Sequence, residues 1–176
     1  PKALPFGASH VHGVSLQAEE ARKLLEEAGW KDTDGNGYVD KDGKDLTIRW
    51  LTYPGRMELP ALAELVQDDL KQIGIKVDIE CSADHLKVLE AGNYDVYASA
   101  LVTAPTGDPE YFFHTCALDQ STKNRGFYHN DRLEALAKEM HQTFDIEKRN
   151  QLAIEMQQII LDDHAFYFIS YLQMGI

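Results

Sequence analysis

The sequence predicts an α/β fold, in which a parallel sheet with a βαβαβ core is flanked by helices and followed by extra C-terminal helices. Segments with the two-residue alternation of strands are separated by segments whose apolar residues recur at helical spacing. Strands that alternate with helices of this length form a parallel sheet covered on both faces. If both crossovers are right-handed and their helices cover opposite faces, the first strand lies between the other two.

The first predicted element is a helix over residues 17–28, QAEEARKLLEEA. Leu24 and Leu25 lie on its apolar face, Ser15 is available as the N-cap, and Gly29 provides the stop. A turn rich in Asp and Gly follows the helix.

The predicted βαβαβ core begins after this turn. Residues 46–52, LTIRWLT, alternate and predict the first strand. A helix from about Met57 to Ile73 has apolar residues at helical spacing and ends at Gly74. The remaining predicted elements are a strand at 75–80, a short helix from Asp84 and a largely buried strand from Tyr94.

The region after the third strand is mainly helical. The loop TAPTGDP (103–109) leads into a short aromatic helix, EYFFHTCA (110–117). Two longer helices are predicted at about 130–143 and 146–163, and Asp145 caps the second. The closing segment AFYFISYLQM (165–174) predicts a strand.

The composition indicates a globular chain, and we expect residues 1–176 to form a single domain. Seventeen basic against twenty-nine acidic residues give a net charge of −12, which argues against a phosphate-backbone partner, so we expect no nucleic-acid partner. No apolar run reaches the roughly 18 to 20 residues of a transmembrane helix. The chain starts PKALPFGASH, without an initiator Met or a signal peptide, so we expect it to be a piece of a longer protein.

The Asp/Gly turn raises the question of calcium binding. Asp32, Asp34 and Asn36, with the glycine after them, fit the opening of an EF-hand loop. Gly43 stands at the twelfth position, where that loop needs a Glu, and a strand is predicted in place of the exiting helix. We therefore favour a surface turn, with a calcium-binding structural domain on the Asp32–Asp40 loop as an alternative.

Histidines are the candidate metal ligands. His10 and His12 point to the same side if the segment SHVHG is extended, although a solvated segment also fits this pattern. His114 follows three aromatic residues and either faces a cleft or packs in the core. His85 and His141 stand among charged residues and are predicted to lie on the surface.

Two further features leave alternatives open. Cys81 and Cys116 match no zinc pattern and are either free or joined in one disulfide. The sequence has no G-x-S-x-G, HExxH or glycine-rich phosphate motif, so a small α/β enzyme is only an alternative function.

Four stretches of the chain carry a family resemblance: AEEARKLLEEAGWKDTDGNGYVDKDGKDLTIRWLTY, ELVQDDLKQIGIKVDIE, the GDP of the loop, and FYHNDRLEALAKEMHQTFDIEKRNQLAIEMQQIILDDHAFYFISY. In this order they resemble the C-terminal lobe of the bacterial extracellular solute-binding proteins of the peptide/nickel family (family 5), which are receptors of ABC importers. The loop TAPTGDP and the closing SYLQM look more like the nickel-binding branch.

The resemblance implies a periplasmic-binding-protein type II lobe from a two-lobed receptor, with the N-terminal lobe absent from this chain. It implies a binding protein and no enzyme, with no cofactor except nickel as a transported solute. The solute would be a nickel chelate or a short peptide, passed on to ABC permease and ATPase subunits. The full-length protein would be periplasmic or extracellular and anchored to the membrane as a lipoprotein.

The loop TAPTGDP is the candidate ligand-binding site, because it leaves the C-terminal end of a parallel strand, where open α/β sheets bind ligands. Thr103, Thr106 and the backbone of Gly107 offer hydrogen-bond donors there. Asp108 and His114 complete the candidate ligand-binding set. An ordinary turn, stiffened by its two prolines, is the alternative.

Overall fold

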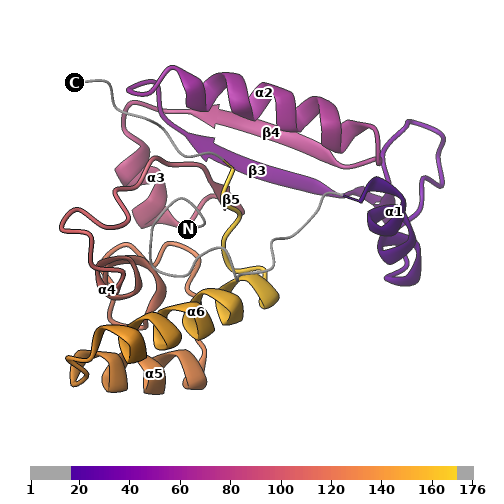
Figure 1. The fold of residues 1–176 in the computed structure, drawn as a ribbon. Helices are drawn as coiled ribbons and strands as arrows, with labels where there is room; N and C mark the ends of the chain where they lie inside the picture. The colour runs from indigo at the N-terminus through magenta and orange to yellow at the C-terminus, as the bar shows by residue number, and fades with distance from the viewer. Residues whose placement is uncertain (1–16, 170–176) are drawn as a thin grey trace. The chain divides into compact units, whose positions relative to one another are not determined.

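The computed structural model describes residues 17–169, which form two compact units (Figure 1). We call residues 17–101 the sheet unit and residues 102–169 the helical unit. Within the described residues, no helix is both long and apolar enough to cross a membrane. That the whole chain acts as one domain of a two-lobed receptor stays a prediction.

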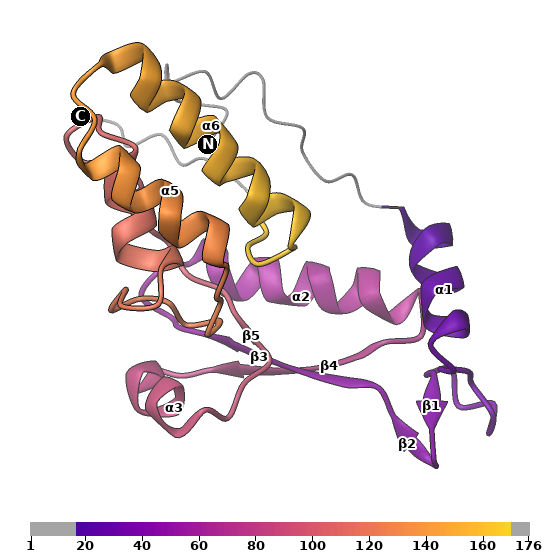
Figure 2. The same ribbon diagram turned by 90° about the horizontal axis from the view of Figure 1, so that it is seen from below.

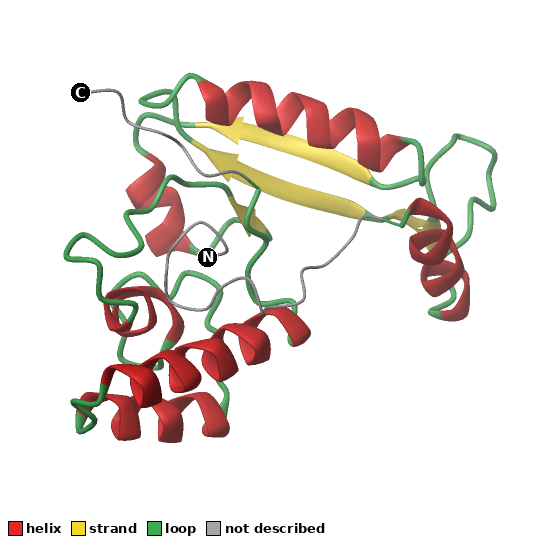
Figure 3. Cartoon of the chain, viewed as in Figure 1, coloured by secondary structure: helices red, strands yellow, loops and turns green. Residues whose placement is uncertain are grey.

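The sheet unit contains a parallel three-stranded sheet in the order β4-β3-β5 (Figures 1 and 3). The strands are β3 (Thr47–Thr52), β4 (Lys76–Cys81) and β5 (Val96–Tyr97). The predicted fold class and the central place of the first strand are therefore confirmed. Because β3 pairs on both sides, its backbone groups have partners along most of its length.

The third strand is shorter than the sequence predicts. Asp95 uses its carboxylate to accept the backbone N–H of Arg49 (2.8 Å) and also holds the Arg49 guanidinium (2.8 Å). The side chain thus replaces a strand carbonyl at this position, and pairing as a strand begins only at Val96; it ends at Tyr97, so residues 98–101 of the predicted strand 94–101 are not strand.

Helices α2 (Glu58–Lys71) and α3 (His85–Ala91) lie on opposite faces of the sheet, as Figure 2 shows. The face under α2 carries the apolar side chains that alternate along each strand. The buried members of this core are Trp50, Ala63, Val77 and Ala98. The helix α1 (Ala18–Glu27) and a short hairpin of β1 (Asp40–Lys41) and β2 (Lys44–Asp45) precede the sheet.

The Asp/Gly turn between α1 and β1 is held by its own side chains. The Asp32 carboxylate accepts the backbone N–H groups of Gly35 (2.7 Å) and Gly37 (2.9 Å). The buried Asp40 carboxylate accepts the backbone N–H (2.7 Å) and the hydroxyl (2.8 Å) of Thr33. Strand β3 follows this region, so the exiting helix of an EF-hand is absent at residues 47–52.

The helical unit consists of α4 (Glu110–Phe112), the π-helix η2 (Phe113–Ala117), α5 (Asp131–His141) and α6 (Ile146–Asp162). Asp145 caps α6 by accepting the backbone N–H of Lys148 (2.8 Å), as predicted. Its core is formed by residues of all four helical segments and by Leu118: Phe112, Phe113, Cys116, Ala117, Leu118, Leu133, Leu136, Ala137, Met140, Leu152, Ala153, Met156 and Ile160.

The predicted closing strand does not form over residues 165–169. Phe166 and Phe168 instead place their rings against Phe112, with centroids 5.6 and 5.7 Å away. Residues 170–174 of that prediction lie outside the described residues, as does the proposed cap Ser15.

Cys81 and Cys116 are both free, and burial raises the pKa of the Cys116 thiol.

Asp163 joins the beginning of α5 to the end of α6. Its carboxylate accepts the hydroxyl of Tyr128 (2.6 Å) and the side-chain amide of Asn130 (2.8 Å), the residue that caps α5. These hydrogen bonds hold the pKa of Asp163 below its usual range. Burial and the carboxylate together raise the pKa of Tyr128.

We predict that Asp163→Ala lowers the melting temperature by a few degrees at pH 7, because both hydrogen bonds are lost. Since the folded-state pKa of Asp163 lies below the unfolded value, its contribution is present at neutral pH and is lost as pH falls through the folded pKa. The difference between variant and parent should therefore shrink below about pH 4. Thermal melts at several pH values measure this.

The neighbouring exposed carboxylate Asp162 provides the control. It accepts a hydrogen bond only from Gln158, one turn earlier on the same helix (2.7 Å), among the contacts of the described residues. Asp162→Ala should change the melting temperature by less than Asp163→Ala at pH 7. Equal effects of the two substitutions would contradict the role given to Asp163.

Candidate functional site

The carboxyl edge of the sheet unit is the first candidate region. β3, β4 and β5 run parallel, so their C-terminal ends meet at one edge, where open α/β sheets bind ligands. Tyr53 directly follows β3, Ser82 follows β4 and Tyr97 ends β5. Ser82 donates its backbone N–H to the carbonyl of Thr52 (2.9 Å), which keeps the two strand ends together.

Three rings gather at this edge, and we call them the aromatic cluster: Tyr53, His85 and Tyr97. The rings of Tyr53 and His85 are stacked, with centroids 4.4 Å apart, and the ring of Tyr97 lies 6.2 Å from that of His85. The Tyr53 hydroxyl also accepts the backbone N–H of Ala100 (3.3 Å), which fixes the ring. The cluster can bind apolar or planar groups by stacking.

His85 differs from its prediction as a surface residue. Its ring is half-buried, and its Nδ1 atom is buried without a hydrogen-bond partner in the described part of the chain. The sequence does not predict this, because the two tyrosines next to the His85 ring lie 32 residues before and 12 residues after it, one following β3 and the other ending β5. Tyr53 directly follows the first predicted strand, but Tyr97 stands in the middle of the third predicted strand (94–101), so no pattern placed the two tyrosines together.

The predicted ligand loop lies in the helical unit. Thr106 is exposed and Thr103 is half-buried. Gly107 adopts a positive φ of 82° and donates its N–H to the carbonyl of Ala104 (3.1 Å), which makes a tight turn. The loop thus contains a tight turn, as the alternative interpretation of an ordinary turn expects. Ligand binding by these residues stays a prediction.

Asp108 is engaged in contacts that organise the start of α4. One carboxylate oxygen accepts the backbone N–H of Glu110 (2.9 Å), and both oxygens accept from Nη2 of Arg149 (2.9 Å each). A ligand would therefore have to share Asp108 with these partners or meet it at its exposed side, since the side chain is 47% exposed.

Arg149 connects this turn to two helices. Its Nη2 also donates to Oε2 of Glu110 (2.8 Å), while Nη1 donates to the carbonyls of Met140 (2.8 Å) and Thr143 (3.0 Å) at the end of α5. Burial raises the pKa of Glu110, but hydrogen bonds from Arg149 and His141 outweigh it, so the pKa of Glu110 lies below its usual range. We call Asp108, Glu110 and Arg149 the charged network.

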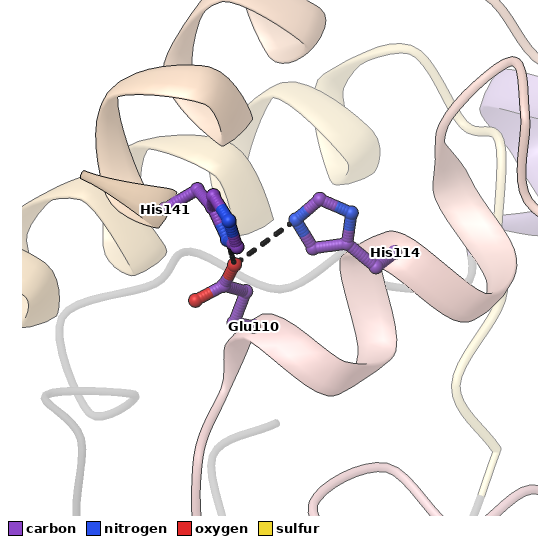
Figure 4. Close-up of side chains that lie close together, drawn as sticks. All are labelled: Glu110, His114 and His141. Carbon is purple, nitrogen blue, oxygen red and sulfur yellow. Dashed lines mark hydrogen bonds and ion pairs between the residues drawn. The ribbon is translucent and has the colours of Figure 1, made fainter.

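His114 and His141 meet at the charged network, as Figure 4 shows. Both rings point at Oε1 of Glu110, with Nε2 of His114 at 3.1 Å and Nδ1 of His141 at 2.9 Å. His114 is half-exposed and so does not pack in the core, and His141 is exposed as predicted. His10 and His12 lie outside the described residues, so metal binding by them stays a prediction.

No local pattern indicates that His141 belongs with the predicted loop, and only one feature indicates it for Arg149. Arg149 is 41 residues from Asp108, and His141 is 31 residues from Glu110. Only the packing of α5 and α6 behind the loop brings these side chains together. An arginine inside an otherwise amphipathic helix, facing the core side, was the signal available.

The sheet unit thus carries stacked rings at the edge where open α/β sheets bind ligands, and a polar turn follows it in the chain. The model of the bacterial extracellular solute-binding proteins, family 5 (Middle) matches residues 3–124, and the chain belongs to this family.

Similar proteins include binding proteins named for two kinds of solute. The chain is 32% identical to the oligopeptide-binding protein AppA of Bacillus subtilis (strain 168) and 30% identical to the nickel-binding protein NikA of Staphylococcus aureus (strain NCTC 8325 / PS 47). Each match covers 87% of this chain and 29% of the relative.

Solved structures confirm the fold. The nickel ABC transporter protein of Bacillus halodurans has 27% sequence identity and a TM-score of 0.74, over 92% of this chain and 34% of that protein. The chain thus spans about a third of the length of its relatives, and the predicted type II periplasmic-binding-protein lobe is confirmed as a fold class.

We predict that Arg149→Met destabilises the protein by about 2 to 3 kcal/mol, because the charged hydrogen bonds from Arg149 to the carboxylates of Asp108 and Glu110 are lost. The pKa of Glu110 is lowered in the folded state, so this contribution is present at neutral pH and is lost as pH falls through that pKa. Urea unfolding at pH 7 and near pH 4 measures both effects, with the smaller loss expected at acid pH.

Arg132→Met is the matched control. Arg132 also pairs with a carboxylate, Glu155 (2.7 Å), but both side chains are largely exposed, at 61% and 45%. Exposed pairs contribute less than about 1 kcal/mol. If Arg132→Met lowered the free energy of unfolding as much as Arg149→Met does, the charged network would contribute no more to stability than an exposed ion pair.

Proposed function

We propose that this chain is a solute-binding lobe of an extracellular receptor that captures a nickel chelate or short peptides for an ABC importer. The match of residues 3–124 to the family 5 model carries this proposal. Relatives of similar identity are named for oligopeptide and for nickel, so both solutes remain within the proposal. The intact receptor would work outside the membrane, anchored to it, and would dock on permease and ATPase subunits.

The chemistry of the candidate regions supports binding of a small polar solute. The aromatic cluster offers stacking surface at the carboxyl edge of the sheet. The loop residues Thr103 and Thr106 offer hydroxyls that can donate or accept hydrogen bonds. We assign ligand contact to these groups, with Gly107, Asp108 and His114 beside the loop.

Calorimetric titration of the full-length receptor with a mixture of short peptides and, separately, with a nickel–histidine chelate tests this function. Substitution of Tyr53 by Ala or of Thr106 by Val should weaken binding of the solute that gives heat, by about tenfold or more for a removed stacking contact. Ala135→Ser, at an exposed position of α5, is a control that should leave the affinity unchanged. Absence of binding by the full-length receptor to both solute classes would refute the proposal.

We also predict that the 176-residue chain alone binds its solute much more weakly than a receptor of the relatives' full length. Small-molecule sites usually bury 70 to 90% of the ligand surface, and a single lobe supplies one wall of such a site. A micromolar ligand is held by about 8 kcal/mol, so the loss of half that energy gives a millimolar affinity. Calorimetry on both proteins measures this, and comparable affinities would show that one lobe holds the whole site.

A further inference from the structure

The strongest group of potential metal ligands in the described residues is Glu110, His114 and His141, of which His114 also belongs to the proposed ligand-binding set. Each offers one ligand atom, and these three atoms all lie within 4.8 Å of one another. Glu110 and His114 are four residues apart on the continuous helical stretch of α4 and η2, so they share a face, while His141 comes from the last turn of α5. Figure 4 shows the three side chains converging.

The distances suit coordination of a metal ion. In a tetrahedral site with bonds of about 2.0 to 2.1 Å, neighbouring donor atoms lie about 3.3 Å apart. Oε1 of Glu110 already lies 3.1 Å from Nε2 of His114 and 2.9 Å from Nδ1 of His141. Small side-chain rotations would therefore open room for an ion, with each histidine carrying its proton on the nitrogen that faces away.

The carboxylate is held so that a single oxygen is available. Oε2 of Glu110 accepts a hydrogen bond from Arg149 (2.8 Å), which leaves Oε1 to face the two rings. Arg149 also holds the carbonyl of Met140, the residue next to His141, so the same side chain positions ligands from two helices. Supports of this kind orient metal ligands in proteins and commonly change metal affinity 10- to 100-fold.

The local charge favours a cation. The single guanidinium of Arg149 faces two carboxylates, those of Asp108 and Glu110, so the charged network has a net charge of about −1 with neutral histidines. Two imidazole nitrogens and one carboxylate oxygen select late first-row metals over calcium or magnesium, which prefer oxygen ligands.

We propose that Glu110, His114 and His141 form a surface site for a divalent late first-row metal ion such as Zn²⁺ or Ni²⁺. The exposed histidine rings leave further coordination positions open to water or to a donor atom of another molecule. The site is made by the helical unit alone and does not rest on the proposed transport function.

Titration of the protein with ZnCl₂ and NiCl₂, followed by calorimetry, tests the site. The chain used carries His10→Ala and His12→Ala, so that the predicted HxH segment does not contribute. We expect one ion per chain, with the affinity reduced at least tenfold by His114→Ala and by His141→Ala. His129→Ala is the matched control, because His129 is exposed and faces two carboxylates, Asp119 (2.8 Å) and Asp131 (3.2 Å), and should keep the affinity.

A second measurement guards against variants that fail to fold. Zn²⁺ should raise the melting temperature of the His129→Ala chain and not that of the His114→Ala or His141→Ala chains, since a bound ion stabilises only the folded state that binds it. Arg149→Lys, which keeps the charge but not the forked donors, should weaken Zn²⁺ binding about tenfold. Equal Zn²⁺ affinity in the His114, His141 and His129 variants would overturn the proposal, as would a stoichiometry that none of them changes.

Because the probe is the metal salt alone, the result is separate from the transport function. Failure of Zn²⁺ and Ni²⁺ binding would overturn the metal site alone, because the peptides and the nickel chelate are titrated separately. Conversely, metal binding at this site in a protein that captures neither solute would support the site and refute the proposed function.

Discussion

The hydrogen bonds of the Arg149 guanidinium connect the loop and the helices of the helical unit, and the arrangement of this unit depends on them. The guanidinium reaches the loop at Asp108, the start of α4 at Glu110 and the end of α5 at Met140 and Thr143. A planar group with five donors can meet these acceptors at once, whereas an ammonium group acts as a point charge. Its 18% exposure means that most of this contact lies away from water, where unpaired charges are costly.

In the sheet unit, the central strand β3 has the corresponding role. Leu51 and Thr52 are almost fully buried, and both neighbouring strands take their register from β3. The register places Tyr53, Ser82 and Tyr97 at one edge, so the aromatic cluster follows from strand pairing and not from any local motif. A one-residue slip would turn these side chains to the other face.

Local sequence signals predicted the elements but not the side-chain groups between them. Periodicity and caps located α1, α2, α5 and α6, and Asp145 was recognised because capping is decided within a few residues. The late start of β5 was not foreseen, because it depends on the Asp95 carboxylate bonding to Arg49 on another strand. The stack of His85 and the pairing of Arg149 likewise depend on residues far apart in sequence, which no local pattern encodes.

The π-helical turn shows the same limit in another form. The sequence EYFFHTCA predicts one short helix, and the structure changes from α to π winding at Phe113. Phe112, Phe113 and Cys116 are all buried, so core packing on both sides of the change outweighs local helix geometry. His114 lies in this π turn and so shares a face with Glu110.

The balance of charge in the helical unit also restricts how a solute is recognised there. The carboxylates of Asp108 and Glu110 carry two negative charges, and the guanidinium of Arg149 carries one positive charge. This guanidinium is already hydrogen-bonded to both carboxylates and to backbone carbonyls. A solute carboxylate, such as the end of a peptide, would find no available cation in the charged network and would be repelled by it. The hydroxyls of Thr103 and Thr106 are neutral and can form hydrogen bonds with a positively or a negatively charged group. The loop is therefore suited to contact the polar backbone of a solute, while the face with Glu110 and the two histidines is suited to a positive charge.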